Sequence, residues 1–158
     1  VARLDALRAA ARQVRFFGST RIDTCSGIPD GRLQVELVKA TIEHGNAAWS
    51  AGVGRQGTAD RYSAYFAGRW LDDLTTEVAA LRSARQVREA RLDALEFTSV
   101  QLVDDESATA ETIENWQDRT VAEDGSLVRD ASGRLRQHYD LRLIDGLWKI
   151  VDAHIVRE

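Results

Sequence analysis

The period of the apolar positions changes once along this chain, near residue 92. Before that point apolar residues recur every three or four positions, which is the spacing of one buried face of an α-helix. The spacing predicts helices over residues 1–17 and 33–50, then a short helix carrying Tyr62, Tyr65 and Phe66. A longer helix follows, and it is expected to fray among the arginines 82, 85 and 88. The apolar stripes are Leu4, Leu7, Ala11 and Val14, then Val38, Ile42, Gly45 and Trp49, then Leu71, Leu74, Val78 and Leu81.

From Leu92 to Val156 the apolar and polar residues alternate with a period of two, which is typical of strands with one buried face. Two strands are predicted before a polar segment, 122–133, which is expected to form a long hairpin loop. Two more strands, Leu135–Ile144 and Leu147–Val156, flank the Asp145-Gly146 pair. That dipeptide favours a tight hairpin turn, because both of its central positions need a positive φ.

The order of these elements predicts one α+β domain, with N-terminal helices packed on a curved, twisted antiparallel sheet. In the third strand Tyr139, Leu141 and Leu143 share the face expected to lie on the core. His138, Asp140 and Arg142 share the opposite, solvated face. In the last strand, strict alternation places Asp152 and His154 on the same face as Trp148 and Ile150.

The end of the chain resembles a known family. The segment Gln137–Leu143, the Asp145-Gly146 turn and then Trp148–Val151 are similar to the closing strands of the nuclear transport factor 2-like superfamily. SnoaL-like cyclases and ketosteroid isomerases belong to that superfamily. The resemblance implies a cystatin-like cone over residues 33–158, preceded by an extension, residues 1–32. It implies a pocket between helices and sheet but no single activity, because this fold serves enzymes, cargo binders and accessory domains alike.

Composition narrows the classes of function. The chain has 158 residues with a net charge of −4, so it lacks the overall positive charge that attracts nucleic acid. No apolar run approaches the roughly 20 residues needed to cross a bilayer. The single cysteine, Cys25, cannot form an internal disulfide or a zinc site alone. It slightly favours a cytoplasmic location over a tethered extracytoplasmic one. The chain starts at Val1 and contains no methionine, which suggests either a removed initiator or an excised domain.

One pair on the predicted sheet combines a carboxylate with an imidazole. Asp152 and His154 are two residues apart, and a carboxylate beside a histidine can orient it as a general base. If the protein is an enzyme, these two residues and the hydroxyl of Tyr62 are the catalytic candidates. The alternative is that Asp152 and His154 form an exposed pair near the chain end.

Aromatic residues are the candidates for the lining of a pocket for a flat, apolar ligand. The set chosen is Trp49, Tyr65, Phe66 and Trp148, and its alternative role is plain core packing. Trp116, beside the polar segment, is considered as an exposed anchor for a partner. No motif in the sequence indicates a metal site or a cofactor.

Two functions follow as hypotheses. The first is a non-catalytic module that binds a ligand or a protein, forming an accessory domain of a larger bacterial protein. Its partner is expected to be a second copy of the chain, another protein or a small apolar ligand, with neither nucleic acid nor direct membrane insertion. The second is a small cofactor-free isomerase, dehydratase or cyclase that acts on an apolar substrate in the pocket.

Overall fold

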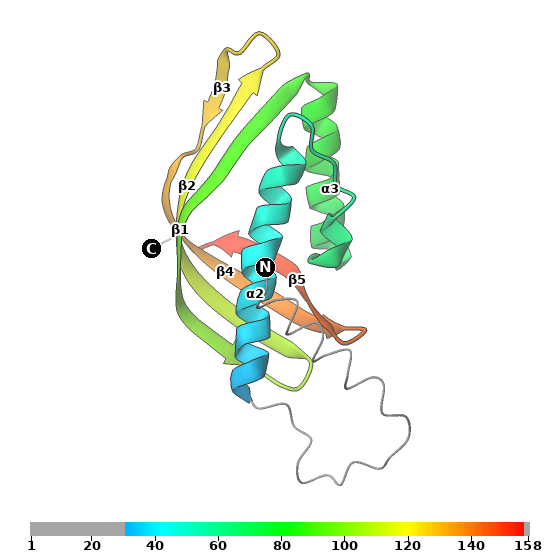
Figure 1. The fold of residues 1–158 in the computed structure, drawn as a ribbon, viewed down its shortest axis with the longest axis vertical. Helices are drawn as coiled ribbons and strands as arrows, with labels where there is room; N and C mark the ends of the chain where they lie inside the picture. The colour runs from blue at the N-terminus through cyan, green and yellow to red at the C-terminus, as the bar shows by residue number, and fades with distance from the viewer. Residues whose placement is uncertain (1–30, 157–158) are drawn as a thin grey trace, which may run out of the picture.

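The computed structural model describes residues 31–156. The predicted helix over residues 1–17 and nearly all of the predicted extension over residues 1–32 lie outside this range. Within it, helix α2 spans Gly31–Val53, a single turn η1 spans Tyr62–Ala64 and helix α3 spans Gly68–Ser83. Both long helices contact the sheet, and Figure 1 shows α2 and α3 side by side on the same side of it.

Five antiparallel strands form one sheet. They are β1 (Gln86–Leu102), β2 (Ser107–Ala122), β3 (Leu127–Asp130), β4 (Gly133–Ile144) and β5 (Leu147–Ile155). The strand order is β1-β2-β4-β5, with the short β3 paired to the end of β2. Figure 1 shows a strongly curved sheet that wraps round the two helices. The predicted α+β class is therefore confirmed.

The sheet begins earlier than the sequence pattern predicts. Strand β1 starts at Gln86, so Arg88 lies on a strand and not at the frayed end of a helix. The chain turns sharply at Arg85, whose φ is +52°. Arg82, at the end of α3, donates hydrogen bonds to the carbonyl oxygens of Gly52 and Gly57, so it holds the loop that follows α2.

The polar segment 122–133 is only partly a loop. It contains β3, which pairs with β2 and extends the hairpin between β2 and β4. All four residues of β3 are exposed, so the strand has no buried face and its sequence shows no alternation of apolar and polar residues. The strand is held by its pairing with β2, and the prediction of a long loop is wrong over these four residues.

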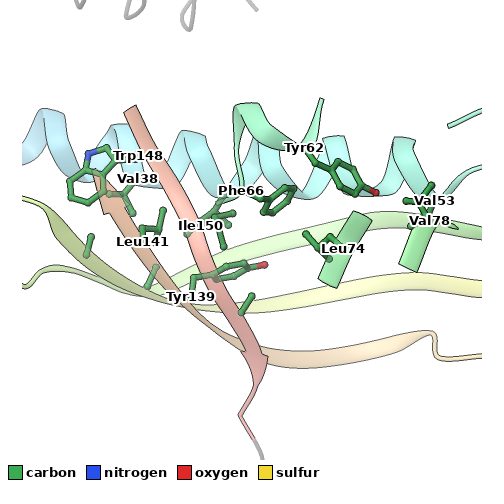
Figure 2. Close-up of a cluster of buried hydrophobic side chains, with 14 residues drawn as sticks. Val38, Val53, Tyr62, Phe66, Leu74, Val78, Tyr139, Leu141, Trp148 and Ile150 are labelled. Atoms are coloured by element: carbon green, nitrogen blue, oxygen red, sulfur yellow. The ribbon is translucent and has the colours of Figure 1, made fainter. Parts of the chain in front are cut away.

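The core lies between the helices and the inner face of the sheet (Figure 2). The predicted stripe of α2 is buried, with Val38 and Ile42 fully covered. Gly45 sits so close to β5 that an added Cβ would lie 2.9 Å from the Ile150 Cδ1 atom, which explains a glycine inside the helix. The buried core residues are Val38, Ile42, Val53, Tyr62, Phe66, Leu74, Val78, Ala108, Ala110, Tyr139, Leu141, Trp148, Ile150 and Ala153.

A β-bulge in β5 changes which of its residues face the core. Asp140 of β4 is opposite Asp152, but its neighbour Leu141 is opposite Ile150, so Val151 is an extra residue. An extra residue reverses the alternation beyond it. Trp148 and Ile150 point inward before the bulge, and Ala153 points inward after it. The prediction that Asp152 and His154 share the face of Trp148 and Ile150 is therefore wrong.

Candidate functional site

A cavity of about 660 Å³ opens between α2, α3 and the inner face of the sheet. This volume is within the range of small-molecule sites, roughly 300–1,000 Å³. Its walls combine aromatic side chains from the helices with polar side chains from β1 and β2. The lining residues are Asn46, Trp49, Phe66, Trp70, Leu74, Glu77, Arg88, Glu114, Trp116, Asp118, Arg129, Ala131, Leu135, Gln137, Tyr139, Ala153, His154 and Ile155.

Glu114 of β2 is the centre of a buried polar network, which we call the Glu114 network. Its Oε1 atom accepts hydrogen bonds from the hydroxyls of Thr112 at 2.7 Å and Tyr139 at 2.6 Å. Asn46 Nδ2 donates to the same oxygen at 3.4 Å, and Trp116 Nε1 donates to Oε2 at 2.6 Å. The side chain is 1% exposed, so these four donors replace the water that a carboxylate would otherwise bind.

The Glu114 network also acts on Tyr139. Burial raises the pKa of the Tyr139 hydroxyl well above its usual value, and the nearby Glu114 carboxylate raises it further. The hydroxyl therefore stays protonated and keeps donating to Glu114 across the neutral pH range. Because Asn46 Nδ2 donates to the Tyr139 oxygen at 3.0 Å, the network joins α2 to the adjacent strands β2 and β4.

A second group of charged side chains, the Arg88 cluster, forms another wall. Arg88 of β1 binds Asp118 with two hydrogen bonds, one from Nε to Oδ1 at 2.7 Å, and binds Glu77 of α3 through Nη1. Trp49 donates from Nε1 to Glu77 at 3.0 Å, and the Arg88 guanidinium lies 4.6 Å from the centre of a Trp49 ring. Burial opposes the charge of Arg88, but the hydrogen bonds that it donates to Asp118 and Glu77 and the charges of those two carboxylates raise its pKa.

Two of the four predicted pocket aromatics line the cavity. Trp49 and Phe66 do so, and Trp49 packs edge-on against Trp116 with 5.3 Å between ring centres. Tyr65 is outside the cavity and stacks on His44. Trp148 is buried away from the cavity, where its Nε1 donates to Gln34 at 2.7 Å. Trp116 is itself buried at 7% exposure, so its predicted role as an exposed anchor is wrong.

The three predicted catalytic residues are not brought together. Tyr62 is fully buried, and its hydroxyl donates to the Trp49 carbonyl oxygen outside the cavity lining. Asp152 and His154 have half-exposed side chains, 53% and 56%, because the Val151 bulge turns them outward. His154 borders the cavity but Asp152 does not. A catalytic role for this set remains a prediction, and its geometry does not favour it.

The outward face of β4 and β5 carries a symmetric group of polar residues. His138 is directly opposite His154, and Asp140 is directly opposite Asp152. The two imidazole rings are 5.0 Å apart, and each histidine lies 3.4 Å from an aspartate of its own strand. The prediction that His138 and Asp140 point away from the core is confirmed, since Tyr139 and Leu141 are buried on the opposite face.

Sequence reasoning missed the residues that dominate the cavity: Glu114, Asn46 and Arg88. One signal for Glu114 was present, because it shares a strand face with Ala108, Ala110 and Trp116. A lone glutamate on the apolar face of a strand is either buried with partners or marks a site. For Asn46, which follows the buried Gly45, the sequence contains no pattern that indicates a site. Arg88 was missed because it was assigned to the end of a helix and not to β1.

Two further findings concern residues 31–156. No group of three or more histidine, cysteine, aspartate and glutamate side chains within this range is arranged to hold a metal ion. In the same range, neither long helix has the length and apolar character needed to cross a membrane.

The comparisons with known proteins give information about the fold only. No family model matches the chain, and no curated protein sequence matches it either. Among solved structures, the intermembrane space region of the chloroplast protein ARC6 is similar with a TM-score of 0.71 and 15% identity, over 78% of this chain and 97% of that one.

Two bacterial structures are also similar. A ketosteroid isomerase-like protein from Erwinia carotovora atroseptica has a TM-score of 0.52 and 13% identity, over 79% of this chain and 98% of that one. A putative aromatic ring hydroxylase from Novosphingobium aromaticivorans has a TM-score of 0.53 and 13% identity, over 75% of this chain and 87% of that one. At such low identity a likeness of structure concerns the fold alone, and in that respect the resemblance found in the sequence is confirmed: the chain has the nuclear transport factor 2-like fold.

Proposed function

We propose that this domain is a non-catalytic module that binds a small ligand in the cavity between its helices and its sheet. The observation that carries the proposal is the cavity of about 660 Å³, with the aromatic side chains of Trp49, Phe66, Trp70 and Trp116 in its walls. Concave, largely apolar sites with a few fixed polar groups are the usual form of a ligand pocket.

The polar groups of the cavity favour binding over catalysis. Tyr139, the nearest candidate proton donor, is already bound to Glu114, and all three nitrogens of the Arg88 guanidinium are bound to Glu77 or Asp118. Groups held in this way fix the shape of a site, whereas a general acid or base must reach the substrate directly. The similar ARC6 structure is by its description one region of a larger protein, which supports an accessory role for this chain.

The test measures binding of N-phenyl-1-naphthylamine, a neutral dye that fluoresces in apolar surroundings. We expect saturable binding at micromolar concentrations and about tenfold weaker binding for Ala131→Trp, since a lost 1.4 kcal/mol is a factor of ten. Ala131 lines the cavity, so a tryptophan there fills part of it. The matched control is Ala94→Trp, at an exposed position of β1 outside the cavity. A folded protein that never saturates with dye contradicts the proposal.

The second candidate is a cofactor-free isomerase, dehydratase or cyclase. One observation favours it, namely that a buried carboxylate, Glu114, and a tyrosine hydroxyl, Tyr139, both line the cavity. Exchange of the α-protons of 2-tetralone in D₂O, followed by NMR, tests this activity. Exchange faster than in buffer, and abolished in Glu114→Gln, would favour the enzyme over the binding module.

A further inference from the structure

We propose that the ligand of the cavity is a protonated amine carried on an apolar body. This inference rests on the proposed function, because it names the chemistry of the ligand that the cavity binds. Three features of the lining support it. Most of its hydrogen-bond donors are engaged while acceptors remain, its carboxylates outnumber its guanidinium groups, and its aromatic rings already hold one cation. Each feature involves residues of the Glu114 network or the Arg88 cluster.

Most donors of these two groups are engaged with the protein itself. Trp116 Nε1 and the Tyr139 hydroxyl donate to Glu114, and Trp49 Nε1 donates to Glu77. The Arg88 guanidinium donates from Nε, Nη1 and Nη2 to Glu77 and Asp118. A ligand that needs donors at this depth, such as a carboxylate or a phosphate, would meet the second N–H groups of Arg88 Nη1 and Nη2, on a cation already shared with Glu77 and Asp118.

Acceptors, in contrast, remain. A carboxylate has about four lone-pair positions, and in the described part of the chain Glu114 Oε2 receives a single donor, Trp116 Nε1. The Tyr139 hydroxyl has one proton, and its shorter contact is with Glu114 at 2.6 Å, not with Asn46 Oδ1 at 3.2 Å. The Asn46 carbonyl oxygen is then an acceptor as well. The cavity therefore favours a ligand that donates hydrogen bonds.

The charges of the lining point the same way. Three carboxylates line the cavity, from Glu77, Glu114 and Asp118, against the two guanidinium groups of Arg88 and Arg129, with His154 at the border. Arg88 is shared between Glu77 and Asp118, and Arg129 is an exposed residue of β3. Within residues 31–156, the hydrogen-bond donors of Glu114 are all neutral groups, and none of them is a cation. A ligand ammonium would supply that missing positive charge.

The aromatic walls already hold one cation. The Arg88 guanidinium lies over a Trp49 ring at 4.6 Å while the carboxylates of Glu77 and Asp118 bind its nitrogens. Aromatic faces attract cations through the negative charge above the ring, an attraction of about 0.5–2 kcal/mol. Trp70, Trp116 and Phe66 line the rest of the cavity and offer further ring surface to the apolar body and the ammonium of a ligand.

The experiment uses three probes that differ in one terminal group: 4-phenylbutylamine, 4-phenyl-1-butanol and 4-phenylbutyrate. Their affinities are measured by calorimetry at pH 7.5. We expect the amine to bind at least tenfold more tightly than the alcohol, and the carboxylate to bind most weakly. Equal affinities for all three overturn the amine inference and leave the binding module standing, whereas no binding of any probe or of the dye overturns both.

Two substitutions and a peptide sharpen the result. Glu114→Gln should abolish the preference for the amine over the alcohol, while Glu96→Gln, on an exposed position of β1 outside the cavity, should keep it. Circular dichroism establishes whether both variants fold. If Glu114→Gln does not fold, Glu77→Gln takes its place in the test, because Glu77 also lines the cavity and its side chain is partly exposed. A preference unchanged in the folded variant overturns the proposal. A short peptide that contains lysine distinguishes two sources of the ammonium group. If the peptide binds and acetylation of its lysine abolishes the binding, the ligand is a lysine of a protein partner. If only 4-phenylbutylamine binds, the ligand is a free amine.

Discussion

Tyr139 and Glu114 are joined by a 2.6 Å hydrogen bond although they are not opposite each other in the sheet. Tyr139 of β4 pairs with Ala110, and Glu114 of β2 pairs with Leu135. The small Ala110 leaves room for the tyrosine ring on the inner face, and the hydroxyl reaches along β2 to the carboxylate. The Glu114 network therefore depends on the register between β2 and β4 and on the position of α2, since its members come from these three elements.

Removing the Tyr139 hydroxyl should destabilise the fold. In Tyr139→Phe the buried Glu114 carboxylate loses its shortest Oε1 donor, and Asn46 loses an acceptor. A buried acceptor that loses a hydrogen-bond partner costs about 1–3 kcal/mol. Urea unfolding should show that loss as a lower midpoint with an unchanged slope. The matched control is Tyr65→Phe, a half-buried tyrosine outside the cavity, which should stay within about 0.5 kcal/mol of the parent.

Alkaline pH should also destabilise the fold. Burial raises the pKa of Tyr139 and of Tyr62 above the ordinary value of 10.0, and the charges of Glu114 and Glu77 add to the two shifts. A group whose pKa is raised by folding contributes stability that is complete below its unfolded pKa and is lost as pH rises towards its folded pKa. The free energy of unfolding should therefore fall above pH 10.

Urea midpoints measured from pH 8 to pH 12 check this fall. In Tyr139→Phe the decrease in the free energy of unfolding with pH should be shallower. This variant has lost one of the two buried hydroxyls that lose their protons at lower pH in the unfolded state than in the folded state. A variant with the same slope as the parent would show that other groups control the alkaline transition. Tyr65→Phe is again the control, and its slope should equal that of the parent.

Much of the fold was accessible from the sequence because burial there follows a regular period. The stripe of Val38 and Ile42 on α2 and the alternation of Tyr139 and Leu141 on β4 are both buried as predicted. The Asp145-Gly146 turn is confirmed by a positive φ at both residues, +51° and +74°. In each case one local pattern is enough, since the side chains concerned meet a single continuous core.

The candidate site was less accessible because it depends on interruptions of such patterns. The extra residue Val151 reverses the face of everything beyond it in β5, and no glycine or proline marks the position. The exposed strand β3 has no buried face at all. In the sequence, Glu114 is one polar residue of an alternating strand. Its partners Asn46 and Tyr139 are 68 and 25 positions away along the chain, so no local pattern shows that they surround it.

The reversal at Val151 leads to a prediction about the residues first chosen as catalytic. Asp152→Asn should leave both dye binding and stability unchanged within about 0.5 kcal/mol, the usual effect of a surface substitution. Its carboxylate is half exposed and lies outside the cavity lining. Dye titration and urea unfolding measure the two quantities. A tenfold loss of affinity would mean that Asp152 acts on the cavity, in spite of its position on the outer face.

Gly52 should not tolerate a side chain. An added Cβ would lie 2.3 Å from the Tyr62 hydroxyl and 2.6 Å from two ring carbons, and that ring is fully buried. Forcing extra atoms into a packed core typically costs about 1–3 kcal/mol. Gly52→Ala should therefore lower the urea midpoint. Gly45→Ala is the comparison and should cost less, because its added Cβ would meet the ends of two side chains, Ile150 Cδ1 at 2.9 Å and Phe66 Cζ at 3.3 Å, which need to shift less than the Tyr62 ring. Equal losses for the two variants would contradict this explanation.

Arg88 should matter more for stability than any exposed arginine of the same strand. Replacing it by methionine keeps most of the side-chain volume but leaves Glu77 and Asp118 without their shared cation. Breaking a buried ion pair costs about 3–5 kcal/mol, and because Arg88 and its partners keep 11–28% of their side chains exposed, we expect about 2–4 kcal/mol. Arg91→Met, three residues further along β1, removes an ion pair with Asp93 whose arginine is 69% exposed, and should cost less than about 1 kcal/mol. Adding Asp118→Asn to Arg88→Met removes one of the unpaired carboxylates and should restore part of the loss. If the double variant is no more stable than Arg88→Met, the loss comes from packing on Trp49 and not from charge.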